Sequence, residues 1–109
     1  MLTTAPLTNL AQALQKDHSL EKRIRKVVIM GGAISGGNVS PVAEANIAND
    51  PEAARIVFRS GMEKILIGLD VTHKVYLEDD DLKELVKISN ERSQFLINII
   101  NFIYLYTMI

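Results

Sequence analysis

The 109-residue chain contains no cysteine and no tryptophan, and only 6% of its residues are aromatic. Without cysteine, the chain can form neither a disulfide framework nor a thiolate metal site. This composition fits the cytoplasm, which is the location we expect. The formal net charge is −1, from 12 basic and 13 acidic residues. Because positive charge is not in excess, we expect no broad attraction to nucleic acid or to an anionic membrane.

Long apolar runs are also scarce. The amino terminus does not read as a signal peptide, because no basic region precedes an apolar run and polar side chains interrupt it. The most apolar stretch, residues 95–109, is broken by Asn98, Asn101 and Thr107 and is shorter than the roughly 20 residues of a membrane span. It is typical of a buried core helix. In a chain without elements to cover it, this surface should drive self-association into a homo-oligomer.

The hydrophobic pattern predicts alternating helices and strands in a single domain, residues 1–109. Helices are expected at 6–16, 19–25, 50–60, 79–88 and 91–107. Strands are expected at 26–30 and 65–69, with two weaker candidates at 2–4 and 75–77. Strand, helix and strand in that order indicate a parallel βαβ unit. The predicted fold class is therefore α/β, an open and mainly parallel sheet of Rossmann-like βαβ units, flanked by helices on both faces.

Helix ends are marked by capping residues. Asp50 is a natural N-cap for the helix at 50–60, with Pro51 suited to its first position and Gly61 to its end. Ser19 is the expected cap of the helix at 19–25. Three aspartates at 79–81 place negative charge at the positive end of the next helix. They lack the spacing and closing glutamate of an EF-hand calcium loop.

The most informative segment is residues 31–58, where a buried strand leads into a glycine-rich turn. Asn38, Glu44 and Asn46 follow within nine residues. Polar groups just past the carboxyl end of a buried strand lie where open α/β sheets bind ligands. The segment is not a dinucleotide fingerprint, because Ala33 replaces the second glycine and Pro41 follows instead of a helix. Nor is it a P-loop, because no Gly-Lys-Ser/Thr closes it.

Four motifs in this chain resemble those of the inosine–uridine-type nucleoside hydrolases. Residues 37–38, 43–46 and 50–54 read GN, AEAN and DPEAA, similar to the GN, AEFN and DPEAA of the family's ribose-binding segment. Residues 4–9 (TAPLTN) are similar to the family's TGPLTN turn, and 68–72 (GLDVT) match a downstream segment. Residues 27–32 (VVIMGG) lie at the family's spacing. The resemblance covers about residues 2–102 and the family's central segment only, because the Asp-rich motif DTDPGIDD and the later His-Asp pair have no counterpart.

The resemblance implies part of a nucleoside-hydrolase-type sheet and an enzyme of nucleoside salvage that releases base and ribose from a purine or pyrimidine nucleoside. Asn38 and Asn46 would bind ribose hydroxyls, and Glu44 would accept a hydrogen bond from the 5′-hydroxyl end. Met30 would line the pocket floor. Thr4 would give its backbone carbonyl to calcium, the implied cofactor. No catalytic residue is expected here, because the base-activating aspartates and the acid histidine of the family lie outside the matched segment.

Each assignment has a plainer structural alternative. Asn in a turn often forms only a side-chain-to-backbone hydrogen bond, which is the alternative for Asn38. Glu44 taken alone would more often lie on the surface. Asp70 and Thr72 are expected to fix a strand-end turn.

Two histidines and two motif positions differ from the family's pattern. His18 and His73 match no catalytic histidine of the family and are expected to be surface or structural residues. Ala5 replaces a glycine in the turn after Thr4, and Ala45 replaces the phenylalanine of AEFN, which removes an apolar wall from the expected pocket.

Two functions of different classes follow. The first is a segment of a calcium-dependent nucleoside N-ribohydrolase. The second is a truncated, catalytically inactive chain that acts as a binding or self-associating module. Calcium affinity separates them, because one backbone carbonyl cannot make a site of roughly 6–8 oxygens. A dinucleotide-binding module is a remote third possibility, for the reasons of glycine spacing given above.

Overall fold

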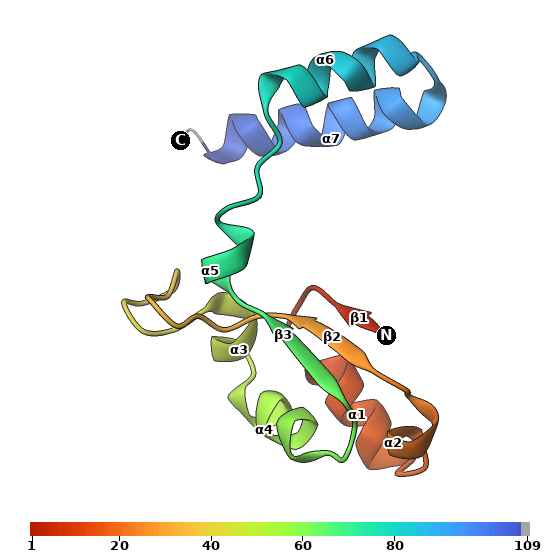
Figure 1. The fold of residues 1–109 in the computed structure, drawn as a ribbon, viewed down its shortest axis with the longest axis vertical. Coiled ribbons are helices and arrows are strands. Elements are labelled where there is room, and N and C mark those ends of the chain that lie inside the picture. The colour runs from red at the N-terminus through yellow and green to blue at the C-terminus, as the bar shows by residue number, and fades with distance from the viewer. Residues whose placement is uncertain (108–109) are drawn as a thin grey trace. The chain divides into compact units, whose positions relative to one another are not determined.

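A computed structural model describes the backbone of residues 1–107 and the side chains of residues 1–103. These residues form two compact units, Met1–Val75 and Tyr76–Ile109. The expectation of one domain stays a prediction. Figure 1 shows the sheet in the first unit and two long helices in the second.

The first unit contains a three-stranded parallel sheet in the order β1-β2-β3 (Figure 1). Its strands are β1 (Leu2–Thr3), β2 (Val27–Met30) and β3 (Lys64–Ile67). In the register, Leu2 lies opposite Val28, and Met30 lies opposite Ile67. The carboxyl ends of the strands therefore meet at one edge. The α/β prediction is confirmed, including the candidate strand at residues 2–4.

Five helices accompany this sheet: α1 (Thr8–Lys16), α2 (Leu20–Arg23), α3 (Ala45–Ala48), α4 (Pro51–Arg59) and α5 (Leu69–Thr72). The single-turn helices α3 and α5 were not expected from the sequence. The candidate strand at residues 75–77 was wrong, because these residues form no regular element. Its alternating pattern has no neighbouring strand to pair with in the described part of the chain.

One face of the sheet carries the core. Val27 and Ile29 of β2 are fully buried, whereas Leu2 and Ile65 on the opposite face are 67% and 41% exposed. This difference follows from the alternation of side chains along a strand. Because α1 and α4 contact each other and supply most of the remaining buried residues, helices cover one face within this unit. The other buried members are Leu7, Leu10, Ala11, Leu14, Ala53, Ala54, Val57 and Met62.

Two of the predicted caps differ in outcome. Asp50 caps α4 as expected, accepting a hydrogen bond from the Ala53 N–H (3.0 Å) and one from the Thr8 hydroxyl, and Pro51 is the first helical residue. Ser19 precedes α2, but its side chain makes no capping hydrogen bond. Instead, the Ser19 N–H donates to Asp17 (2.9 Å). Helical backbone angles at Ser19 place it inside the turn, where a side-chain cap is not formed.

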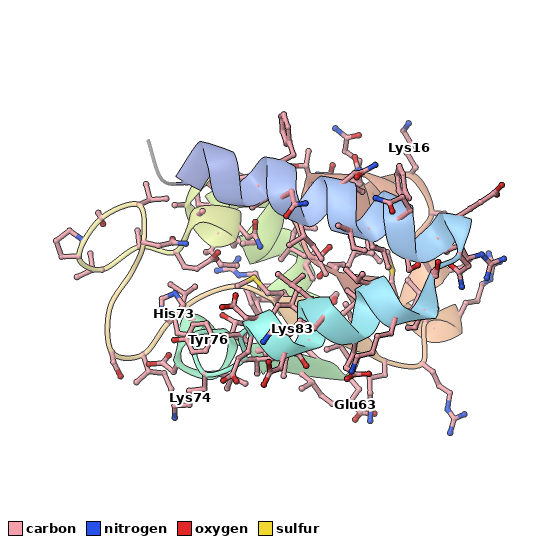
Figure 2. All side chains as sticks on the ribbon, turned by 90° about the horizontal axis from the view of Figure 1, so that it is seen from above. Lys16, Glu63, His73, Lys74, Tyr76 and Lys83 are labelled. Atoms are coloured by element: carbon pink, nitrogen blue, oxygen red, sulfur yellow. The ribbon has the colours of Figure 1, made fainter. Side chains whose placement is uncertain are left out.

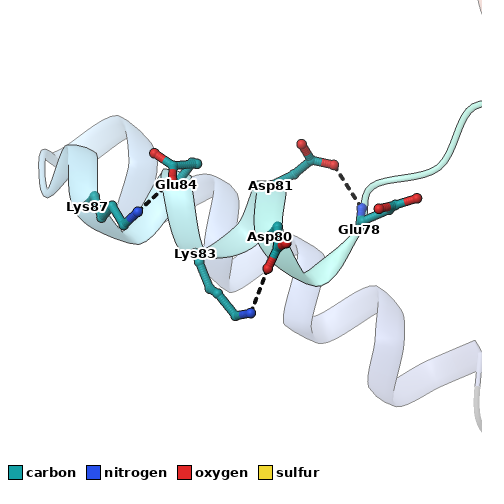
Figure 3. Close-up of polar contacts among 6 residues, drawn as sticks. All are labelled: Glu78, Asp80, Asp81, Lys83, Glu84 and Lys87. Atoms are coloured by element: carbon teal, nitrogen blue, oxygen red, sulfur yellow. Dashed lines mark hydrogen bonds and ion pairs between the residues drawn. The ribbon is translucent and has the colours of Figure 1, made fainter.

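The second unit is a helical hairpin of α6 (Asp79–Ile88) and α7 (Glu91–Thr107), joined through Ser89 in a left-handed conformation. Asp81 accepts a hydrogen bond from the Glu78 N–H (2.9 Å) and closes a capping box at the start of α6 (Figure 3). Lys83 pairs with Asp80 and Lys87 with Glu84, each at 2.6 Å, along the same helix.

The surface of α7 differs from the expected buried core helix. Phe95 and Phe102 are 64% and 60% exposed, and Leu96, Ile99 and Ile103 are also exposed. Residues 104–109 of that expectation lie outside the described side chains. No helix of the described residues combines the length and apolarity needed to cross a membrane.

Candidate functional site

The Asn46 side chain joins the carboxyl ends of β1 and β2. Its Nδ2 donates to the Met30 carbonyl oxygen (3.2 Å), contacts the Met30 Sδ (3.1 Å) and lies 3.4 Å from the Thr4 carbonyl oxygen. Three of the predicted site residues are thus brought together. Because both carbonyls can only accept, the amide nitrogen must face them and Oδ1 must face away. No hydrogen bond to this oxygen occurs within the described residues.

Glu44 directly precedes α3 as its N-cap residue and is only 4% exposed. Its Oε2 accepts hydrogen bonds from the Gly32 N–H (2.9 Å) and the Ile47 N–H (3.2 Å), and its Oε1 accepts one from the Asn46 N–H (3.0 Å). The carboxylate therefore caps α3 and ties it to the glycine-rich turn. The plainer expectation of a surface glutamate is wrong. Since Oε1 accepts a single bond, it keeps capacity for a further donor.

Asn38 makes the hydrogen bond that its turn alternative predicts. Its Oδ1 accepts from the Ala45 N–H (2.9 Å), while its own N–H donates to the Ala43 carbonyl (3.0 Å). The preceding Gly37 has no room for a side chain, because a Cβ there would lie 2.1 Å from the Ala43 carbonyl oxygen. Asn38 is exposed, and within the described residues no hydrogen bond uses its side-chain N–H groups. The residue therefore combines turn formation with a free donor group.

Backbone hydrogen bonds connect these polar residues. Asn38 holds the N–H of Ala45, and Glu44 holds the N–H of the next residue, Asn46. Because both contacts fall at the start of α3, the amides and the carboxylate are fixed to one short segment. The arrangement places the exposed Asn38 amide, the half-buried Asn46 amide and the buried Glu44 carboxylate near the carboxyl edge of a parallel sheet. Amides and carboxylates are groups suited to binding hydroxyl groups.

Asp70 is a further residue of this region, expected from the sequence only to fix a strand-end turn. It lies in α5, and its carboxylate accepts hydrogen bonds from the N–H groups of Ile34 (2.7 Å) and Ser35 (3.0 Å). The bond from Ile34, and then those from Ser35, lower the pKa of Asp70 from 3.8 to about 2. Only the GLDVT motif pointed to this residue from the sequence.

An open cavity of about 460 Å³ adjoins Asp70. His73 and Lys74, labelled in Figure 2, follow α5 and line this cavity, and both are exposed. His18 is exposed as well, so the expectation of surface histidines is confirmed. The cavity is lined by Ser35, Gly36, Gly37, Leu69, Asp70, His73 and Lys74.

The described residues do not fit calcium by themselves. Across the residues that the structure describes, no group of three or more His, Cys, Asp or Glu side chains could hold a metal ion. The Thr4 carbonyl, the one ligand implied by the family resemblance, is 3.4 Å from the Asn46 amide nitrogen. One carbonyl falls well short of the roughly 6–8 oxygens that calcium takes.

Known proteins are similar to this chain over almost its whole length. Residues 1–108 match the family described as inosine-uridine preferring nucleoside hydrolase. The chain is 45% identical over 103 residues to uridine nucleosidase 1 of Arabidopsis thaliana, covering 94% of this chain and 31% of that protein. It is 42% identical over 106 residues to the pyrimidine-specific ribonucleoside hydrolase RihA of Photobacterium profundum, covering 97% of this chain and 34% of the relative.

Solved structures agree with the sequence comparisons. A purine-preferring ribonucleoside hydrolase from Gardnerella vaginalis is similar with a TM-score of 0.81 at 42% identity, over 88% of this chain and 31% of that one. A plant nucleoside hydrolase, the PpNRh1 enzyme, gives a TM-score of 0.80 at 40% identity, over 89% and 31%. The chain thus spans about a third of the length of these relatives. Its motifs, its fold and a match over residues 1–108 show that it belongs to the inosine-uridine preferring nucleoside hydrolase family.

Proposed function

We propose that this chain carries the ribose-binding segment of a nucleoside N-ribohydrolase, which splits a nucleoside into free base and ribose. The observation that carries the proposal is the Asn46 amide, bound to the carbonyls of Thr4 and Met30 at the ends of two parallel strands. The relatives are named for uridine, pyrimidine and purine nucleosides, which supports the nucleoside class and favours no single base.

In this proposal each polar group has one task toward the sugar. The Asn46 Oδ1 accepts a hydrogen bond from a ribose hydroxyl, and the exposed Asn38 amide donates one. The Glu44 Oε1 accepts from the 5′-hydroxyl end, and the Met30 side chain forms the apolar floor. Because backbone hydrogen bonds already hold these groups, little side-chain freedom is lost when the sugar binds. The segment positions ribose while the bond between sugar and base breaks, and we assign no catalytic residue within it.

We further propose that the Thr4 carbonyl is one oxygen ligand for calcium in the complete site. The other ligands must come from residues outside those described here or from a second chain, because a calcium ion takes roughly 6–8 oxygens. The isolated chain should therefore bind calcium weakly.

The test of this function is ribose release from inosine and uridine by the purified chain, with calcium and again with EDTA. Asn46→Ala removes the proposed sugar contact, and Asn9→Ala is the matched control, because Asn9 is exposed on α1. Turnover that EDTA abolishes, that Asn46→Ala loses and that Asn9→Ala keeps supports the proposal. Absence of turnover in a chain that circular dichroism shows to be folded contradicts an enzyme made of this chain alone.

The second candidate function is an inactive binding or self-associating module that forms a homo-oligomer. The exposed apolar side chains of α7 favour it, since Phe95, Ile99 and Phe102 recur on one side of that helix. No charged residue follows Arg92 along α7. Concentration-dependent assembly of a chain that neither binds nor turns over a nucleoside would select this candidate over the enzyme segment.

A cytoplasmic location and the absence of a nucleic-acid partner are also proposals. The lack of cysteine supports the location, and the net charge of −1 supports the absence of nucleic-acid binding. A fluorescent fusion found outside the cytoplasm, or binding to duplex DNA at physiological salt, would contradict them.

A further inference from the structure

We propose that Asp70 is a positioning residue, whose carboxylate holds the glycine-rich turn of residues 31–37 and thereby sets the place of Asn38. The consequence for ligand binding rests on the function proposed above. The structural part of the inference rests on hydrogen bonds alone. Asp70 comes from α5, at the end of the strand next to the one that leads into the turn.

The first observation is that Asp70 contacts two successive backbone donors. Its Oδ2 accepts from the Ile34 N–H at 2.7 Å, and its Oδ1 accepts from the Ser35 N–H at 3.0 Å. A carboxylate that accepts from N–H groups with both oxygens fixes their relative orientation as well as their distance. These two bonds hold the middle of the turn, residues 34 and 35, to α5.

The second observation is that the residues just before Asp70, Gly68 and Leu69, pack closely against Gly32 at the start of the turn. The Leu69 N–H donates to the Gly32 carbonyl at 3.0 Å. A Cβ on Gly68 would lie 3.0 Å from the same oxygen, so a side chain there would push the two segments apart. Movement of α5 away from the turn would break this hydrogen bond. The contact therefore holds the backbone of Asp70 in place next to the turn.

The third observation is how the turn connects to Asn38. Glu44 holds one end of the turn through the Gly32 N–H (2.9 Å). The other end enters a tight loop, where Gly37 donates to the Pro41 carbonyl (3.1 Å) and Asn38 accepts from the Ala45 N–H. Asp70 acts between these two anchors. Loss of its carboxylate frees the middle of the turn, and Asn38 follows because only Gly36 and Gly37 separate it from Ser35.

The experiment compares Asp70→Ala with Asp81→Ala in the full chain. Asp81 also accepts from a backbone N–H, that of Glu78 in the helical hairpin, and is therefore the matched control. Amide exchange and chemical shifts are followed by NMR. We expect Asp70→Ala to speed exchange at Ile34 and Ser35 by about tenfold, because their N–H groups lose their acceptor, and to shift the Ala45 amide and the Asn38 side-chain signals.

Asp70→Asn keeps one acceptor oxygen and should give an intermediate effect, while Asp81→Ala leaves all four signals unchanged. A far-UV spectrum like that of the unsubstituted chain shows that each variant is folded. The positioning role is overturned if Ala45 and Asn38 do not respond while Ile34 and Ser35 do, because Asp70 would then act only locally. It is equally overturned if exchange at Ile34 and Ser35 does not change.

The ligand consequence is tested by titrating the same proteins with uridine and inosine. If the unsubstituted chain binds, we expect Asp70→Ala to weaken affinity about tenfold and Asp81→Ala to leave it unchanged, and equal affinities would overturn the consequence. If the unsubstituted chain binds neither nucleoside, the proposed function fails for this chain. The Ala45 and Asn38 signals then still decide the positioning role.

Discussion

Glu44, Asp50 and Asp70 each direct a carboxylate at backbone N–H groups that no secondary structure satisfies. Glu44 holds two such groups at the start of α3 and a third, the Gly32 N–H, in the glycine-rich turn. Asp50 caps α4, and Asp70 holds two more N–H groups in the glycine-rich turn. Hydrogen bonds to ionised groups are stronger than those between neutral groups. The acidic residues of this region therefore stabilise the local backbone conformation. Only those carboxylate lone pairs that accept no backbone hydrogen bond are available for a ligand.

The first prediction concerns Glu44. Replacing Glu44 with Ala should lower the free energy of unfolding by about 1–3 kcal/mol, because three N–H groups next to a buried position lose their acceptor. Urea denaturation followed by circular dichroism measures the change. Glu63→Ala is the control, since Glu63 is exposed and its carboxylate forms an exposed ion pair with Lys26 at 2.8 Å. An equal, small effect of both substitutions would contradict the role of Glu44.

The second prediction concerns pH. Asp70 has a pKa of about 2 in the folded chain, below its ordinary value of 3.8, so its ionised form is favoured by folding. The stability that it contributes is present above the unfolded pKa and is lost as pH falls through the folded pKa. We expect the difference in unfolding midpoint between the unsubstituted chain and Asp70→Asn to shrink from pH 5 to pH 2. A constant difference over that range would show that the charge of Asp70 makes no contribution.

At the scale of elements, the site depends on how α1 and α4 are packed beneath the sheet. Leu10 and Leu14 of α1 and Val57 of α4 are buried together with Val27 and Ile29 of β2. This core holds β2 in place, and the carboxyl end of β2 carries Met30 and the glycine-rich turn. The short helix α3, capped by Glu44, then presents Asn46 to the same edge.

The third prediction tests this packing. Leu10→Ala should lower the free energy of unfolding by about 2–5 kcal/mol, because it removes buried methylene groups and leaves a cavity. Leu2→Ala is the matched control, since Leu2 is 67% exposed and its truncation removes little buried surface. Urea denaturation of both variants measures the difference. A cost for Leu10→Ala no larger than that for Leu2→Ala would show that α1 is not part of the stable core.

At the scale of the whole molecule, apolar surface remains uncovered on both units. The first unit exposes Leu2 and Ile65 on the open face of its sheet, and the second exposes Phe95 and Phe102 on α7. The solved relatives are about three times as long as this chain, so each holds the matching segment inside a larger fold. Uncovered apolar surface of this kind favours association.

The fourth prediction is that the isolated chain self-associates through α7. Sedimentation velocity at rising protein concentration should show assemblies larger than a monomer, and Phe95→Lys should shift the distribution toward the monomer. Ile34→Lys is the control, because Ile34 is 95% exposed on the glycine-rich turn and carries the same change from apolar to cationic. A chain that stays monomeric at all concentrations would contradict the prediction, as would equal effects of the two substitutions.

Much of the fold could be predicted from local pattern, because long helices and buried strands repeat with a clear period. The strand at 26–30 and the helices at 6–16, 50–60, 79–88 and 91–107 were found close to their observed bounds. The single-turn helices α3 and α5 were missed, since four residues are too few to show a helical period. The candidate strand at 75–77 failed because a strand needs a partner, which its own residues cannot specify.

The sequence by itself determined the family, the α/β class and the identity of the polar residues, because motif spacing and apolar periodicity are properties of the chain alone. Only the tertiary structure decided which atoms of those residues already form hydrogen bonds within the protein. Asn38 and Glu44 hold backbone N–H groups, and Asp70 holds the turn from the helix α5. Asn46 directs its amide nitrogen at the Thr4 and Met30 carbonyls. A hydrogen bond between segments far apart in the sequence depends on packing, and no local pattern encodes it.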